Sequence, residues 1–246
     1  MRGLPGEIRG ARVAHVLTLR LNRPDSMLPF THQQFVFVFA LYNGVIWPLQ
    51  WVAQAVGIGM LALLWRPSRD RGRISILLLA AMWLWTGLAY HAAFFSLINP
   101  AATTFGAFFV LEGLLLAEAG LRGRLAFGEA SGLSRGFGWA LLVYSVVGYP
   151  ALGLMLGERV LELPAFGLTP CPVVLTTLGM LLLAAGPVRP WLFVIPVAWA
   201  LIGGSAAVLL RVPQDWPLLL SPFLLAIVVI RERLQGRIAA GGLARR

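Results

Sequence analysis

The chain has no lysine, and all twenty of its basic residues are arginines. A retinal protein needs a lysine to form its Schiff base, so this absence excludes that class of seven-helix protein. There is one cysteine, which excludes an internal disulfide and a CxxC metal or redox pair. Three histidines, scattered along the sequence, are too few for a metal site built from histidine alone.

Charged residues are also scarce. They make up 12% of the 246 residues, whereas hydrophobic residues make up 59%. Soluble domains carry about 25% charged residues. Several apolar runs are longer than the ~18 residues that cross a bilayer. The sequence therefore predicts an all-α, polytopic membrane protein.

The net charge of +10 does not indicate nucleic-acid binding. The arginines lie in short loops between the apolar runs and form no basic face. Arginines in such loops set the orientation of a membrane protein and contact anionic lipid headgroups. We therefore expect the lipid bilayer and its anionic headgroups to be the partners of these charges.

We expect seven transmembrane helices. Thr31 and Gln34 fit a capping box at the start of the first helix. Gly44 and Pro48 should kink that helix, so the part before Asn43 is expected to lie partly in the membrane interface. The approximate ranges of the seven are 33–65, 74–97, 101–120, 137–156, 171–187, 190–210 and 215–231.

Arginine counts predict the orientation of these helices. Thirteen arginines fall on one side, in the expected loops and the C-terminal tail, whereas Arg159 and Arg211 fall in loops on the other side. Positive loops stay in the cytoplasm, so we expect a cytoplasmic C-terminus, an outside N-terminus and a place in the bacterial inner membrane. Residues 27–231 would form the seven-helix domain and residues 232–246 a basic cytoplasmic tail.

The first 26 residues oppose this orientation, because they would place five more arginines outside. They also lack the apolar core of a signal peptide. We expect the true start to be Met27, which makes residues 1–26 a non-native or disordered extension. The alternative is a genuine extension that is disordered or lies on the membrane surface.

Polar residues at membrane depth gather toward the predicted outer side. Glu112 departs from this trend, since it lies ~17 Å along its helix, near the midplane. A buried carboxylate is costly and is functional by default, so Glu112 is a candidate proton or cation relay. The alternative is a neutral acid that is hydrogen-bonded to a neighbouring helix. The candidates for an outer vestibule or a ligand site are Asn43, Tyr90, His91, Asn99, Tyr149, Cys171 and Asp215.

His91 and Cys171 each allow two interpretations. His91 could bind a metal, a haem or a substrate, or it could be an interfacial histidine hydrogen-bonded to a loop carbonyl. Pro172 suits the first position of a helix, which makes Cys171 the residue where that helix starts. Cys171 could equally be a reactive thiol, because a helix N-terminus favours the thiolate.

The stretch "IGGSAA", residues 202–207, presents small side chains on one helix. Gly203, Gly204 and Ser205 are expected to allow close helix packing. The alternative is a substrate groove.

Four stretches are similar to a bacterial family of multi-pass inner-membrane proteins that is catalogued only as a domain of unknown function. They are "MLPFTHQQF", "YHAAFFSLINPAA", "FGLTPCP" and "IPVAWALIGGSAAVLLRVPQD". The resemblance covers about residues 27–230, and its start at Met27 also supports the later translation start. It implies a membrane protein without an assigned activity, so no catalytic residue is transferred from it.

Three functions agree with these observations. The first is a small transporter for an ion, a metal or a small molecule, with Glu112 as a relay and the outer polar residues as a vestibule. The second is a redox protein or a metal- or haem-binding protein that uses His91 and Cys171. The third is an assembly or sensory partner of another membrane protein, or a homo-oligomer. No hydrolase, metalloprotease or phosphate-loop motif is present, and the sequence identifies no cofactor.

Overall fold

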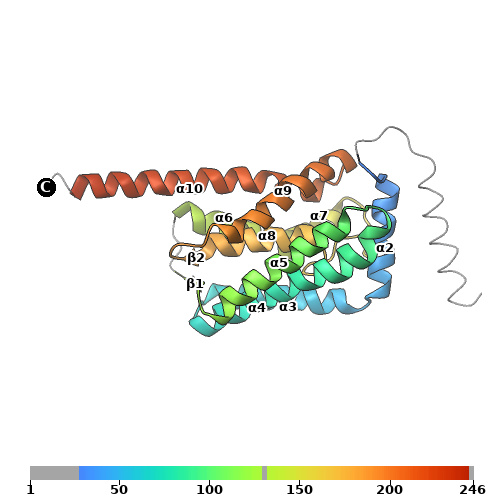
Figure 1. The fold of residues 1–246 in the computed structure, drawn as a ribbon, viewed down its shortest axis with the longest axis horizontal. Helices are drawn as coiled ribbons and strands as arrows, with labels where there is room; N and C mark the ends of the chain where they lie inside the picture. Colours follow the sequence, from blue (N-terminus) through green and yellow to red (C-terminus); the bar gives the residue numbers. More distant parts are fainter. Residues whose placement is uncertain (1–27, 129–131, 244–246) are drawn as a thin grey trace, which may run out of the picture.

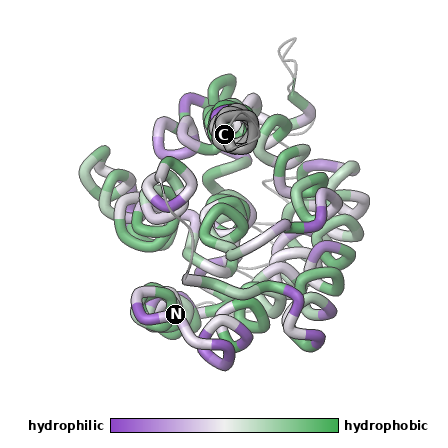
Figure 2. Tube along the Cα trace, turned by 90° about the vertical axis from the view of Figure 1, so that its left-hand side faces the viewer, coloured by the Kyte–Doolittle hydropathy of each residue, from purple (hydrophilic) through white to green (hydrophobic). Residues whose placement is uncertain are grey.

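A computed structural model describes residues 28–128 and 132–243, with side chains as far as Arg231. The expected extension, residues 1–26, lies outside the described residues. The chain is mostly helical, and long apolar helices lie side by side in a bundle (Figure 1). Seen end on, hydrophobic residues predominate along the helices and hydrophilic stretches are short (Figure 2). The prediction of a mostly helical membrane protein is therefore confirmed.

Most helical elements follow one another with short connections, and residues 156–169 form a longer one between α7 and α8. The α-helices are α2 (His32–Val45), α3 (Leu49–Trp65), α4 (Arg69–Trp85), α5 (Ala102–Leu121), α6 (Gly132–Val143), α7 (Tyr149–Met155), α8 (Pro170–Leu183), α9 (Trp191–Leu210) and α10 (Trp216–Leu243). Two π-helical segments, η1 (Thr86–Phe94) and η3 (Tyr144–Gly148), continue α4 and α6, and two short 3₁₀ segments are η2 (Phe95–Leu97) and η4 (Pro213–Asp215). Ala126–Phe127 (β1) pairs antiparallel with Ala184–Ala185 (β2).

Five helices in the described part of the chain are long and apolar enough to cross a membrane, at 69–97, 102–121, 132–155, 191–210 and 213–231. The expected first span is not one helix, because α2 and α3 meet at an angle of 91°. The chain turns at Ile46–Pro48, where Pro48 offers no N–H to an α-helical ladder. The capping box at Thr31 forms as predicted. Counting α2 with α3 gives at most six spans, so seven spans and their orientation stay a prediction.

The bend lays α2 across one end of the bundle, and the β1–β2 pair lies at the opposite end (Figure 1). We call these the α2 end and the β end. The last helix, α10, runs from the α2 end past the β end (Figure 1). It continues to Leu243, so the residues expected to form a separate tail after Arg231 extend this helix as far as Leu243.

The α8 helix replaces the span expected at 171–187. All fourteen of its residues are buried. At 1.5 Å per residue it is about 21 Å long, which is shorter than the ~30 Å hydrocarbon core of a bilayer. Gly138 of α6 and Gly179 of α8 allow close contact, because a Cβ at Gly138 would lie 3.0 Å from the Gly179 carbonyl oxygen. A short helix enclosed by its neighbours is therefore the centre of the bundle.

A non-helical segment, residues 156–169, leads into α8 and is mostly buried from Leu163 onward. The side chain of Asn43 holds its start, because Nδ2 donates hydrogen bonds of 2.8 Å to the carbonyl oxygens of Leu161 and Leu163. The Tyr42 hydroxyl donates to the Leu168 carbonyl, also at 2.8 Å. Buried backbone outside a helix needs hydrogen-bond partners for its polar groups. Side chains of α2 supply such partners here.

Glycines set the packing of α5 against α4 and η1. Three glycines of α5 face α4 and η1 and are spaced seven residues apart: Gly106, Gly113 and Gly120. A Cβ at Gly106 would lie 2.8 Å from the Gly87 carbonyl oxygen, and one at Gly87 would lie 2.7 Å from the Gly106 carbonyl oxygen. The two backbones are thus in direct contact, as small residues permit in membrane helices.

Candidate functional site

A cavity of about 430 Å³ lies at the α2 end, between α2, η1, α5 and α9. We call it the α2-end cavity. Most of its lining is aromatic or aliphatic, including Phe39 of α2, Phe105 of α5 and Trp199 of α9. Ligand sites for small molecules commonly have this size and a mainly apolar lining with a few placed polar groups. The polar or partly polar residues that line it are Tyr90, Asn99, Cys171, Ser205 and Asp215.

The turn that follows α9 places Asp215 at the wall of the cavity. Arg211 follows Leu210 in the left-handed conformation, with φ 56°, and Val212 N–H bonds to the Ala207 carbonyl at 2.9 Å. This reversal at the helix end leads directly into η4. Asp215 is 2% exposed and accepts a hydrogen bond of 2.6 Å from the Tyr149 hydroxyl of α7. Tyr149 therefore supports Asp215 and does not itself line the cavity.

Cys171 lines the same cavity from the start of α8. Its thiol lies beside the Asp215 carboxyl group and the Trp199 indole. The Trp199 Nε1–H makes no hydrogen bond of ordinary geometry with any described residue. One wall of the cavity therefore combines a thiol, a carboxyl group and an indole N–H. This arrangement can hold one polar group of a ligand.

Tyr90 and Asn99 form another part of the wall. The Tyr90 ring stacks on Phe39 and Phe95, with centroids 5.3 Å and 5.6 Å away. The Asn99 side-chain oxygen accepts from the Ala101 N–H at 3.1 Å, which stabilises the turn into α5. Asn43, expected in the same vestibule, is absent from the lining and holds the segment before α8.

His91 lies behind the cavity wall. Its side chain is fully buried, and its ring packs on Phe109 and Trp199 with centroids 4.6 Å and 4.8 Å away. Neither ring nitrogen has a hydrogen-bond partner among the described residues. No loop carbonyl within the described residues is therefore hydrogen-bonded to His91.

Glu112 is also fully buried and unpaired, since neither carboxyl oxygen has a partner among the described residues. It lies on α5 one turn beyond Phe109, which touches His91. Thr86, one π-helical turn before His91 on η1, is a third buried side chain without a partner. Unpaired buried polar groups are costly, so each of them needs a functional or a solvent-based explanation.

The small residues of α9 divide between two roles. Gly203 and Ser205 line the α2-end cavity. Gly204 faces α10, where an added Cβ would lie 2.7 Å from the Cα of Leu219. Gly204 thus lies where the chain packs closely, and Gly203 and Ser205 lie along the cavity.

A cluster of polar residues from two candidate spans, joined to Glu158 of the loop between α7 and α8, adjoins this region. Gln214 Nε2 donates to the Glu158 carboxyl at 2.6 Å, and the Tyr144 hydroxyl donates to the Gln214 carbonyl at 2.7 Å. Burial raises the pKa of the Glu158 carboxyl group, and the Gln214 hydrogen bond partly opposes this shift. Glu158 belongs to a separate hollow with His32 and Glu162.

Several of these residues were not expected to take part. Trp199 and Thr86 carry no sequence signal beyond their types, because a tryptophan or threonine in an apolar run is usually a packing residue. Within the described residues, no three histidine, cysteine or acidic side chains lie close enough to hold a metal ion. His91 and Cys171 occupy different positions, one behind the wall and one on it.

Comparison with known proteins gives one match. Residues 32–240 match the model of DUF6064, described as a family of unknown function. No curated protein and no solved structure matches the chain.

Proposed function

The chain belongs to the DUF6064 family, and we propose that it is a membrane permease for a small, largely apolar molecule that carries one hydrogen-bonding group. The α2-end cavity is the binding site. The observation that carries this proposal is the cavity itself, about 430 Å³ in volume, with a mainly apolar lining and few polar groups, among which Cys171 and Asp215 lie side by side. An apolar body would contact the aromatic lining, and the polar group would reach these two side chains.

Interrupted helices favour movement of the ligand over simple storage. The cavity lies at the start of a short buried helix, which a non-helical segment precedes. Discontinuous helices of this kind form the substrate sites of many transporters. The neighbouring η1 is π-helical, and π-helical turns are frequent at functional sites.

Glu112 is the proposed relay. Its side chain is fully buried and has no hydrogen-bond partner among the described residues. Phe109 lies on the same face of α5, and its ring contacts the His91 ring. Acidic residues at membrane depth commonly carry protons in pumps and transporters. We propose that a proton reaches Glu112 by way of His91, with water between the unpaired groups.

The proposed orientation puts the β end in the cytoplasm. The arginines of the α4 start, the α5 end and Arg189 gather there. Positive residues mark cytoplasmic loops, so the α2-end cavity would open toward the outer leaflet of a bacterial inner membrane.

A binding experiment tests the first step. The probe is a fluorescent long-chain alkylamine, titrated into the purified full-length protein in mild detergent. Ser205→Trp adds an indole to the cavity wall and should weaken binding at least about tenfold, equal to about 1.4 kcal/mol. Leu220→Trp is the matched control, because Leu220 is 57% exposed on α10 and does not line the cavity. Equal affinity in wild type and Ser205→Trp would contradict the proposed site.

A flux experiment tests the second step. In vesicles that contain the purified protein, Glu112→Gln should abolish uptake of the same probe and leave its binding unchanged. Glu118→Gln is the control on the same helix, since Glu118 is partly exposed at the β end. If Glu112→Gln transports as fast as wild type, Glu112 has no relay role.

The other two functions have less support from the described residues. His91 and Cys171 do not face a common space, which a pair of cofactor ligands would require. The small-residue stretch of α9 is in use within the chain, against α10 and around the cavity.

A further inference from the structure

A second pocket, of about 370 Å³, lies at the β end. We call it the arginine pocket. It is enclosed by the first turn of α4, the last residues of α5 and the strand β1. Phe127 of β1 forms one wall by packing on Gly72, where an added Cβ would lie 2.7 Å from the ring. Its lining residues are Ser68, Arg69, Gly72, Arg73, Leu121, Arg122, Gly123, Leu125, Ala126 and Phe127.

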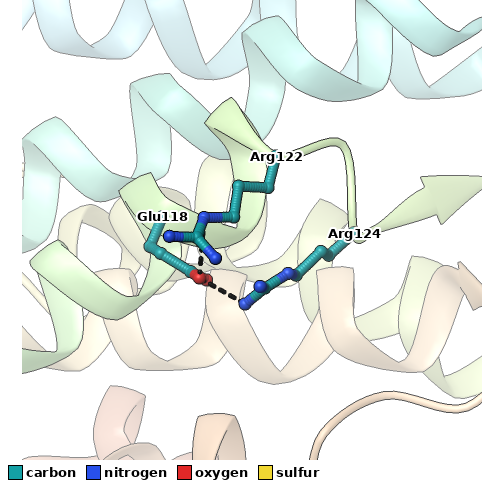
Figure 3. A network of polar contacts seen from close by, with 3 residues as sticks. All are labelled: Glu118, Arg122 and Arg124. Atoms are coloured by element: carbon teal, nitrogen blue, oxygen red, sulfur yellow. Dashed lines mark hydrogen bonds and ion pairs between the residues drawn. The ribbon is translucent and has the colours of Figure 1, made fainter.

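The pocket carries an excess of positive charge. Arg69, Arg73 and Arg122 all line it. Arg122 pairs with Glu118 at 3.2 Å, and Arg124 pairs with the same carboxyl oxygen (Figure 3). One carboxylate is thus shared by two arginines. In the part of the chain that the structure describes, neither Arg69 nor Arg73 makes a salt bridge.

The start of α4 adds to this positive field. Ser68 caps the helix, and the helix dipole places partial positive charge at that end. Helices usually carry acidic residues there, whereas α4 carries Arg69, Arg71 and Arg73 in its first turns. Asp70 is the acidic residue of the first turn, and it does not line the pocket. This arrangement favours the binding of an anion near the start of α4.

The position of the pocket matches the depth of lipid headgroups. Trp65 and Trp139 pack edge to face at the same end, with ring centroids 5.6 Å apart. Tryptophans favour the boundary between the hydrocarbon core and the headgroups. Phosphate is the anion that membranes supply at this level, and arginine binds phosphate oxygens in two-pronged pairs.

We propose that the arginine pocket binds a phosphate group, held by Arg69, Arg73 and Arg122. The site is separate from the α2-end cavity and does not depend on the permease function. A phosphate group reaches it either as part of an anionic lipid headgroup or as free phosphate.

The test compares two double variants of the full-length protein in mild detergent. Arg69→Gln/Arg73→Gln removes two exposed side chains from the pocket. Arg71→Gln/Arg189→Gln is the control, because it removes the same amount of charge from residues that do not line the pocket. The Arg71 side chain bonds to the Arg66 carbonyl, and the Arg189 guanidinium lies over the Trp191 ring. The probes are dioctanoyl phosphatidylglycerol and inorganic phosphate, each followed by calorimetry. Thermal unfolding checks that both variants fold.

The pocket variant should lose affinity for a phosphate probe by about tenfold or more, while the control loses much less. Selective loss for phosphatidylglycerol identifies a lipid headgroup as the source. Selective loss for inorganic phosphate with no lipid binding identifies free phosphate. Equal losses in both variants, or no loss in either, would overturn the proposal, because the charge would then act without a site.

Discussion

Tyr149 and Asp215 form a hydrogen bond of 2.6 Å in the protein interior, where both side chains are at most 2% exposed. The bond orients Asp215 beside Cys171 on the wall of the α2-end cavity. Both were expected near the outer side from their places in the sequence. Their contact with each other could not be predicted, because it depends on how the left-handed turn at Arg211 directs η4.

Tyr149→Phe should lower the free energy of unfolding by about 1–3 kcal/mol, because Asp215 would be left buried without its donor. Chemical unfolding in detergent, followed by circular dichroism, measures this change. Tyr144→Phe is the matched control: its hydroxyl bonds to the Gln214 carbonyl in a half-buried setting, so its loss should cost about 1 kcal/mol or less. Equal costs would show that Asp215 does not depend on Tyr149.

Glu112 shows how far single residues can be assigned from sequence. Its depth and its acidic side chain singled it out, and the structure places it fully buried and unpaired. Its unpaired neighbours on the same helix pair, Thr86 and His91, depend on the π-helical course of η1. A π-helix places residues five apart on one face, whereas an α-helical reading places Thr86 and His91 on different faces.

At the scale of elements, the glycine repeat on α5 sets the helix pair that carries Glu112. Gly106, Gly113 and Gly120 face α4 and η1 and leave no room for side chains at the contact. The seven-residue spacing is visible in the sequence, but which helix it faces is not. The hydropathy of residues 171–187 likewise predicted a helix there. It could not show that other helices surround α8, since a buried helix and a lipid-facing helix are equally apolar.

Gly106→Ala should destabilise the protein by about 1–3 kcal/mol, because the added methyl group would lie 2.8 Å from the Gly87 carbonyl oxygen. Gly59→Ala is the control within α3, where nothing lies within 4 Å of an added Cβ. Alanine favours helix over glycine, so this variant should gain about 0.5–1 kcal/mol or stay unchanged. Thermal unfolding of both variants measures these changes in stability. If Gly106→Ala leaves the stability unchanged, the two backbones are not in contact.

At the scale of the whole molecule, the two ends differ in chemistry. The β end carries the arginine pocket, and the α2 end carries the mainly apolar cavity. Arginine counting predicted which side is positive. It could not predict that α2 crosses the bundle end, because an apolar stretch with a central proline fits one kinked span as well as two helices at 91°.

The orientation has a direct test in a Cys171→Ala background, which has no other cysteine. Val160→Cys lies in the loop between α7 and α8, and Asp70→Cys lies at the β end; both positions are exposed. A membrane-impermeant maleimide should label Val160→Cys in intact bacterial cells and label Asp70→Cys after the cells are opened. The reverse pattern would refute the proposed orientation and place the cavity in the inner leaflet.

Photolabelling tests most directly what occupies the α2-end cavity. A long-chain alkylamine with a diazirine group is bound to the purified protein, irradiated and mapped by mass spectrometry. We predict saturable labelling of residues 199–210 and of α2, competed by excess unlabelled amine and lost in Ser205→Trp. Labelling that is spread over the lipid-facing helices, unaffected by competitor and by Ser205→Trp, would contradict the proposed site.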